Sequence, residues 1–124
     1  MASQKTVSGK IVSEKNSDHA FNSGDLLNVS VIDGSRMDAA SITLGEQTVA
    51  LKAGQKLPIA FNFTYDLSLA TPGANRILVS ADIKDQSGKL LYNNQTATHV
   101  QDNVEVNVEK VLSSEEIQQM LKGQ

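Results

Sequence analysis

Residues 57 to 66, LPIAFNFTYD, place a large apolar side chain at every second position. The large residues are Leu57, Ile59, Phe61, Phe63 and Tyr65, and the residues between them are small or polar. Because successive side chains of a strand point to opposite faces of a sheet, this alternation predicts a strand with one apolar face. That face could line a ligand pocket, dock a partner or fill a core. Filling a core is the simplest of the three, so we expect Ile59, Phe61 and Phe63 to be buried between two sheets.

The same alternation recurs at short intervals along the chain, and Gly, Asn, Asp, Ser or Pro residues bound each segment. Short alternating segments of this kind are typical of an all-β domain. Gly45 interrupts the third segment and indicates a bulge or a break there. Besides 57–66, the predicted strands cover residues 6–13, 26–33, 42–51, 77–84, 90–100 and 104–111.

Seven short strands with one apolar face each must bury those faces against one another. The chain has 124 residues, of which 40% are apolar, and this suits one domain with a single core. We therefore predict an all-β fold over residues 1–112. Its architecture is a single antiparallel β-sandwich of about seven strands, immunoglobulin-like or transthyretin-like.

The sequence changes character after this domain. In SSEEIQQMLKGQ, Ser113 and Glu116 have the spacing of a capping box, and Ile117, Met120 and Leu121 follow at helical intervals. This pattern predicts a short C-terminal helix in a tail formed by residues 113–124. The apolar stripe of the helix could cover one end of the sandwich or bind a partner.

The composition excludes several functional classes. The formal net charge is −3 and the 11 Lys and Arg residues are scattered, so we expect no nucleic-acid interface. The chain has no Cys, which excludes disulfides and thiolate metal sites. No apolar run reaches the roughly 18 residues of a membrane span, and the first residues lack the apolar core of a signal peptide. Either the chain is cytoplasmic or its export segment has been cut away.

Residues suited to catalysis or to metal binding are few and separated. His19 lies in a polar loop and His99 near the end of a predicted strand, and neither has a ligand spacing to a partner. Ser17, Asp18 and His19 are neighbours in sequence, whereas a catalytic triad joins separate elements in space. The carboxylates lie mostly at predicted strand ends, where Asp caps turns, and no calcium loop or phosphate-binding glycine motif is present. We therefore expect no enzyme activity, no catalytic residue, no metal and no organic cofactor.

Six phrases follow one another between residues 7 and 111: VSGKIV, LLNVSVIDGSRMDAA, LPIAFNFTYD, PGANRILVSADI, GKLLYNNQTATHV and VEVNVEKV. Within them stand Asp33 and Ser35 with the nearby Asp38 and Ala39, the spaced residues Pro58, Phe61 and Tyr65, and the loop that leads to RILVSADI. In this order and spacing the chain resembles the YbaY/YscW family of bacterial lipoproteins.

The resemblance implies a location on the inner, periplasmic face of the Gram-negative outer membrane, with a lipid anchor as the only contact to the membrane. Some members of the family are pilotins, which escort secretin subunits of type III secretion to that membrane, and others have no assigned role. This sequence departs from the family in lacking the Cys that carries the anchor and in having the C-terminal helix. A sequence that starts just after that Cys would explain the first departure.

The function implied by the resemblance is a non-enzymatic, pilotin-like chaperone or peptide-binding module for an outer-membrane secretin. An envelope lipoprotein with a structural role and no client is one alternative. An unrecognised enzyme on a sandwich scaffold is another. We expect the protein to be a monomer.

Four apolar residues lie out of phase with the main apolar stripes: Leu26, Ile32, Leu78 and Leu91. We interpret them as candidates for a partner-binding surface, although twisting at strand ends or cover by the helix would also explain them. A secretin segment could bind a sandwich by adding a strand at a sheet edge or by laying a helix into an apolar groove.

Overall fold

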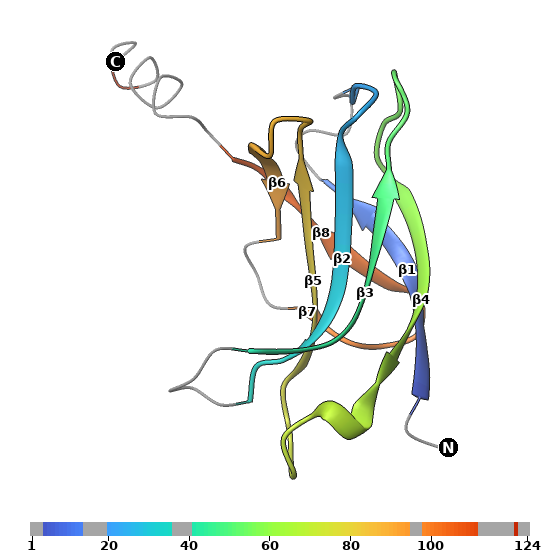
Figure 1. Cartoon of the computed structure of the whole chain (residues 1–124), viewed down its shortest axis with the longest axis vertical. Helices are drawn as coiled ribbons and strands as arrows, with labels where there is room; N and C mark the ends of the chain where they lie inside the picture. The colour runs from blue at the N-terminus through green and yellow to red at the C-terminus, as the bar shows by residue number, and fades with distance from the viewer. Residues whose placement is uncertain (1–3, 14–19, 36–40, 95–97, 112–120, 122–124) are drawn as a thin grey trace.

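Strands make up nearly all of the regular structure in the computed structural model, which describes residues 4–13, 20–35, 41–94, 98–111 and 121 (Figure 1). A short 3-10 helix, η1 (Leu67–Leu69), follows the fourth strand. The strands are β1 (Gln4–Val12), β2 (Leu26–Asp33), β3 (Ile42–Ala50), β4 (Ile59–Asp66), β5 (Ile77–Lys84), β6 (Leu90–Asn93), β7 (Thr98–His99), β8 (Val104–Asn107) and β9 (Glu109–Lys110).

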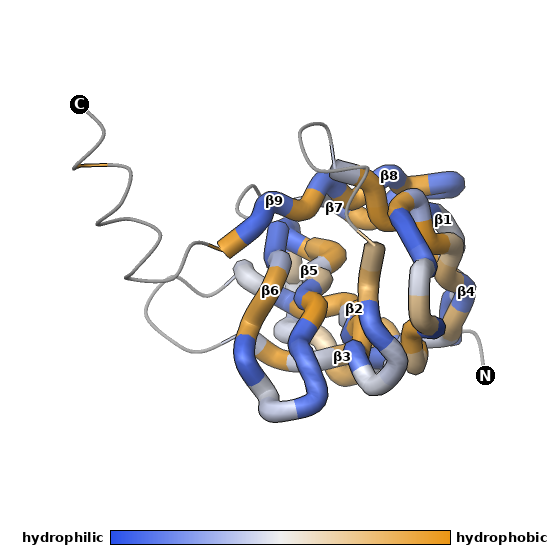
Figure 2. The backbone as a smooth tube through the Cα atoms, turned by 90° about the horizontal axis from the view of Figure 1, so that it is seen from above, coloured by the Kyte–Doolittle hydropathy of each residue, from blue (hydrophilic) through white to orange (hydrophobic). Residues whose placement is uncertain are grey.

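The strands form two sheets that face each other across one core (Figure 2). One sheet has three strands in the order β4-β1-β8, and the other has six, in the order β3-β2-β5-β6-β9 with β7 beside β5. The predicted β-sandwich is therefore present. Every pair is antiparallel except β1 and β8, which are parallel, whereas the sequence predicted antiparallel pairs throughout. β8 follows β7 of the opposite sheet, and this crossover lets it run in the direction of β1.

The inner faces of both sheets are built by the predicted alternation. Ile59, Phe61 and Phe63 are only 4%, 4% and 9% exposed, which confirms that this stripe fills the core. The residues between them in β4 point outward and are exposed. Full burial of such an apolar side chain contributes about 1.5–3 kcal/mol to folding.

One side of the sandwich is closed by the chain from β8 to β9, which leaves the three-stranded sheet and enters the six-stranded one. β8 pairs with β1, the Val108 N–H donates to the Val12 carbonyl oxygen at 2.8 Å, and β9 pairs with β6. The sequence predicted a single strand over 104–111. The structure divides it because its two halves hydrogen bond to different sheets.

The other side is closed by β3, which packs against β4. Gly45 makes this approach possible, because a Cβ at this position would lie 2.6 Å from the Thr64 carbonyl oxygen and 2.7 Å from the Tyr65 Cβ. The register of β2 against β3 shifts between Val31 and Ile32, so the irregularity predicted at Gly45 is a bulge.

The strand predicted over 90–100 is also divided, into β6 and β7. Between these two strands, Asn94 takes over the pairing with β5. Its N–H donates to the Ala81 carbonyl oxygen, its side-chain oxygen accepts from the Ala81 N–H at 3.0 Å, and its side-chain nitrogen donates to the Val79 carbonyl oxygen at 3.1 Å. A side-chain amide thus replaces backbone groups where the chain leaves the sheet.

One end of the sandwich is closed by the loops 20–25 and 51–58. The Phe21 N–H donates to the Gln55 carbonyl oxygen, and the Gly54 N–H donates to the Phe21 carbonyl oxygen, both at 2.8 Å. The Phe21 side chain is 1% exposed and meets Tyr92 edge to face, with the ring centroids 5.6 Å apart. The Phe21 side chain therefore fills this end of the core.

The opposite end holds the start of β1, the helix η1 and the loop that follows it (Figure 1). Gln4 lies opposite Asp66 in the β1–β4 register, so the chain enters β1 beside η1.

The tail helix predicted over 113–124 lies outside the described residues except for Leu121, which is helical and 66% exposed. The division into a sandwich over 1–112 and a tail over 113–124 stays a prediction.

Candidate functional site

The residues predicted to bind a partner lie in three separate places. Ile32 and Leu78 are opposite each other on the outward face of β2 and β5, where Ile32 is half-buried and Leu78 is buried. Leu26 lies on the same face at the other end of β2 and is 44% exposed. Leu91 is half-buried and packs against the core. The structure therefore joins only Ile32 and Leu78, and a partner-binding role for the four residues stays a prediction.

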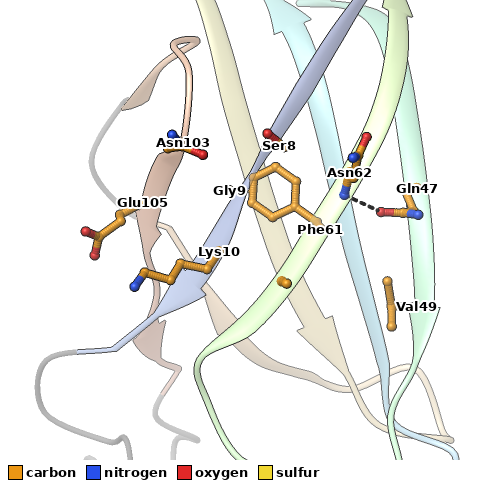
Figure 3. Close-up of a pocket in the computed structure, with 10 residues that line it drawn as sticks. Ser8, Gly9, Lys10, Gln47, Val49, Phe61, Asn62, Asn103 and Glu105 are labelled. Carbon is orange, nitrogen blue, oxygen red and sulfur yellow. Dashed lines mark hydrogen bonds between the residues drawn. The ribbon is translucent and has the colours of Figure 1, made fainter.

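A groove of about 730 Å³ opens on the outer side of the three-stranded sheet (Figure 3). β1, β4 and β8 form most of it, and β3 contributes one wall. Its lining residues are Ser8, Gly9, Lys10, Gln47, Val49, Ala60, Phe61, Asn62, Asn103 and Glu105.

Small residues give the groove its depth. Ala60 faces outward between the buried Ile59 and Phe61, and it lies opposite Lys10 in the β1–β4 register. Gly9 has no room for a side chain, because a Cβ there would overlap with the Val104 carbonyl oxygen. The lack of a side chain at Gly9 thus allows β8 to approach β1 closely beside the groove.

The rim of the groove carries hydrogen-bonding groups and both signs of charge. Lys10 lies opposite Glu105 across β1 and β8, and the Asn62 N–H donates to the Gln47 side-chain oxygen at 3.3 Å (Figure 3). An apolar wall from Val49 and a polar rim suit a peptide segment with an apolar side and polar ends. Among the described residues that line the groove, none is a His, and the one carboxylate, Glu105, belongs to the rim.

A smaller hollow of about 440 Å³ lies at the end of β2 where Leu26 is exposed. Asp82 contributes to its lining, and burial raises the pKa of this carboxyl while the nearby Lys84 lowers it. The hollow holds only one of the four predicted partner-binding residues.

Asp33, one of the residues that carries the family resemblance, fastens a loop instead of facing a ligand. It is 2% exposed, and its carboxylate accepts from the Ser35 N–H at 2.9 Å and the Thr71 N–H at 2.7 Å. Hydrogen bonds, of which the one with the Ser35 side chain is the largest cause, hold the pKa of Asp33 far below its ordinary value. Ser35 in turn accepts from the Asn75 and Arg76 N–H groups. Asp38 and Ala39 lie outside the described residues.

Two further carboxylates cap turns, as the sequence predicted for Asp at strand ends. Asp66 accepts from the Ser68 N–H and hydroxyl, and Asp85 accepts from the Ser87 N–H and hydroxyl and from the Lys89 N–H. These hydrogen bonds, first of all those with the serine side chains, lower the pKa of both carboxyls. Both carboxylates thus have structural roles.

The described residues contain no group of three or more His, Asp or Glu side chains that could hold a metal ion. His99 is exposed on β7, whereas Ser17, Asp18 and His19 lie outside the part of the chain that the structure describes.

The sequence did not predict the groove, because its patterns pointed only to apolar residues on an outer face. Its signal was present in the small outward residues of LPIAFNFTYD, of which Ala60 is the clearest. The alternation alone does not show that these residues line a hollow, because the walls come from β3 and β8.

No helix among the described residues has the length and apolar character that crossing a membrane requires.

Residues 2–112 match the family model described as type III secretion system lipoprotein chaperone (YscW). No curated protein matches the chain.

Among solved structures, the chain is similar to an alternative pilotin from the type II secretion system of Vibrio cholerae. The two share 22% sequence identity with a TM-score of 0.74, and the alignment covers 89% of this chain and 99% of the pilotin chain. At this identity the similarity shows a shared fold.

Proposed function

We propose, since this chain belongs to the YscW family of type III secretion system lipoprotein chaperones, that it is a pilotin-like chaperone without enzymatic activity. Its client would be a segment of an outer-membrane secretin. It would work at the periplasmic face of the outer membrane, held there by an acyl anchor on the N-terminal side of this sequence. The similarity in fold to a pilotin supports the proposal.

The observation that carries the proposal is the groove beside Ala60 (Figure 3). A preformed concave surface on a rigid scaffold favours binding of a peptide, because a flexible site loses free energy when it is ordered on binding. The groove is such a surface, since its floor belongs to β1 and β4, which pair over eight residue positions from Gln4 opposite Asp66 to Ile11 opposite Ile59.

The outward face of the six-stranded sheet is the second candidate for the same function. Leu26 is exposed there, but Leu78 is buried and Leu91 packs against the core, so less apolar area is free to bind. The groove on the three-stranded sheet therefore ranks first.

Calorimetric titration of the full chain with a peptide from the C-terminal region of a secretin tests the proposal. Ala60→Arg fills the groove, whereas Ala50→Arg places the same side chain on the outer face beside Leu26. Both alanines are exposed in strands, so the two variants are matched. We expect Ala60→Arg to weaken binding by about tenfold or more and Ala50→Arg to leave it unchanged, because one such step is about 1.4 kcal/mol of lost contact.

Three outcomes would count against parts of the proposal. Weakening by Ala50→Arg alone would move the site to the second candidate surface. Equal binding by both variants would exclude both surfaces. If the unmodified chain does not bind the peptide, the secretin client is wrong.

A further inference from the structure

The end of the sandwich where β1 begins carries two exposed leucines. In η1, Leu67 is 38% exposed and Leu69 is 54% exposed. The nine residues from 67 to 75, LSLATPGAN, include no Asp, Glu, Lys or Arg. A single exposed leucine needs no explanation, but two of them in one uncharged loop form an apolar surface.

Hydrogen bonds fix this loop with its leucines outward. Asp66 accepts from the Ser68 N–H at 2.9 Å, which shapes η1. Asp33 then accepts from the Thr71 N–H, and Ser35 accepts from the Asn75 N–H, so the far part of the loop is tied to the end of β2. The exposure of the leucines is therefore set by the fold.

The N-terminal side of the chain arrives at the same end. Gln4 is opposite Asp66, the residue that immediately precedes η1, and η1 contacts β1 (Figure 1). An anchor close before Gln4 would therefore bring the η1 end toward the membrane. The opposite end is different, since its loops carry Lys52, Lys56 and Lys89.

We infer that the η1 end is a membrane-facing surface, and that Leu67 and Leu69 insert into the lipid interface beside the anchor. The inference rests on the proposed function, in which the chain is held by an N-terminal acyl anchor. A lipid surface fits this loop because the loop is uncharged and exposes two leucines, and because the exposed Arg76 directly after it suits a headgroup phosphate. Such a contact would orient the sandwich, so that the groove stands beside the membrane and not against it.

Fluorescence on tethered vesicles tests the inference. The chain has no Cys, so one reporter thiol can be introduced, either by Leu69→Cys or by Leu26→Cys. Leu26 is a matched control, because it is 44% exposed at the opposite end. Each full-length variant carries an environment-sensitive dye and an N-terminal histidine tag. The tag binds vesicles of phosphatidylethanolamine and phosphatidylglycerol that contain nickel-chelating and spin-labelled lipid.

We expect the dye at residue 69 to shift to the blue and to be quenched by the spin-labelled lipid, and the dye at residue 26 to show neither effect. Adding Leu67→Asp should reduce the quenching at residue 69 by roughly threefold or more, because it replaces an apolar contact with a charge. This second variant separates insertion from simple nearness to the membrane.

Equal quenching at residues 69 and 26 would overturn the inference, and so would quenching at 69 that Leu67→Asp does not change. A blue shift that grows with protein concentration without vesicles would also overturn it, by assigning the leucines to a contact between two copies of the chain. The secretin-peptide titration is run on the same labelled proteins. Its failure would count against the proposed function and would leave the vesicle result to be judged separately.

Discussion

The two ends of the sandwich differ in whether their apolar side chains are buried or exposed. At one end, loops that contain Lys52 and Lys56 fold over the core and bury Phe21 at 1% exposure. At the other end, an uncharged loop leaves Leu67 and Leu69 exposed and is fastened from below by a buried carboxylate, Asp33. At the first end polar loops cover an apolar side chain, Phe21. At the second end exposed leucines lie above a buried polar side chain, Asp33.

The difference indicates which end contributes to stability and which end is available for contacts. Burial of an aromatic residue contributes several kcal/mol to folding, whereas a half-exposed leucine contributes little. An end that keeps exposed leucines while a network of hydrogen bonds holds them in place is therefore more useful for an interaction than for stability. The groove lies on the side of the sandwich, on the outer face of the three-stranded sheet, so a client and a membrane would not compete for the same surface.

The largest expected effect is at the closed end. Phe21→Ala should lower the free energy of unfolding by about 3–5 kcal/mol, because it leaves a cavity beside Tyr92. Leu69→Ala at the other end should change it by less than about 0.5 kcal/mol, since this side chain is largely exposed. Urea denaturation of both variants measures the difference, and comparable losses would mean that the two ends are equally part of the core.

A smaller effect is expected from Asp33→Asn, which removes the charge that the Ser35 and Thr71 N–H groups bind. The variant should be less stable than Asp66→Asn, because Asp33 is buried and joins two loops while Asp66 caps a single turn. Hydrogen exchange should also quicken at the Thr71 and Asn75 amides and stay unchanged at Phe21. If the Thr71 and Asn75 amides exchange at the same rate in Asp33→Asn as in Asp66→Asn, Asp33 does not hold the loop.

The contribution of Asp33 to stability should depend on pH in a defined direction. Hydrogen bonds lower its pKa in the folded state below the ordinary value of 3.8, so the unfolded chain takes up this proton first as the pH falls. The stabilisation is therefore complete at pH values well above 3.8 and is lost as the pH falls from there toward the depressed pKa. The difference in unfolding free energy between the unmodified chain and Asp33→Asn should narrow below about pH 4. A difference that widens on acidification would contradict this assignment.

A small effect on stability is also expected for the double variant Leu67→Ser, Leu69→Ser. It should leave the thermal midpoint within a few degrees of the unmodified chain, because both side chains are already partly in water. Affinity for the secretin peptide should stay the same, since neither residue lines the groove. A large loss of stability would show that the leucines pack against the core, and a loss of affinity would place the client at this end.

The strands could be predicted from the sequence because the alternation that specifies them is local. LPIAFNFTYD shows its buried face directly, and Ile59, Phe61 and Phe63 lie where the pattern predicts. The bulge near Gly45 could also be located, since glycine inside a strand pattern has few other meanings.

Features that depend on distant partners could not be predicted. The split of 90–100 depends on Asn94 reaching the backbone of Val79 and Ala81, and the split of 104–111 depends on two different sheets accepting its halves. The parallel pairing of β1 with β8 follows from a crossover that no local pattern records. The groove is formed by four strands, and its floor at Ala60 is ordinary in sequence until β3 and β8 stand beside it.

The central claim is that the groove receives a secretin segment while the two ends do not. Backbone amide spectra of the full chain, recorded by nuclear magnetic resonance during titration with the secretin peptide, test it residue by residue. The expected result is that shifts concentrate at Ser8 to Lys10, at Ala60 to Asn62 and near Glu105, and that Phe21, Leu67 and Leu69 stay unchanged. Shifts confined to η1 or to the closed end, or no shifts at saturating peptide, would contradict the claim.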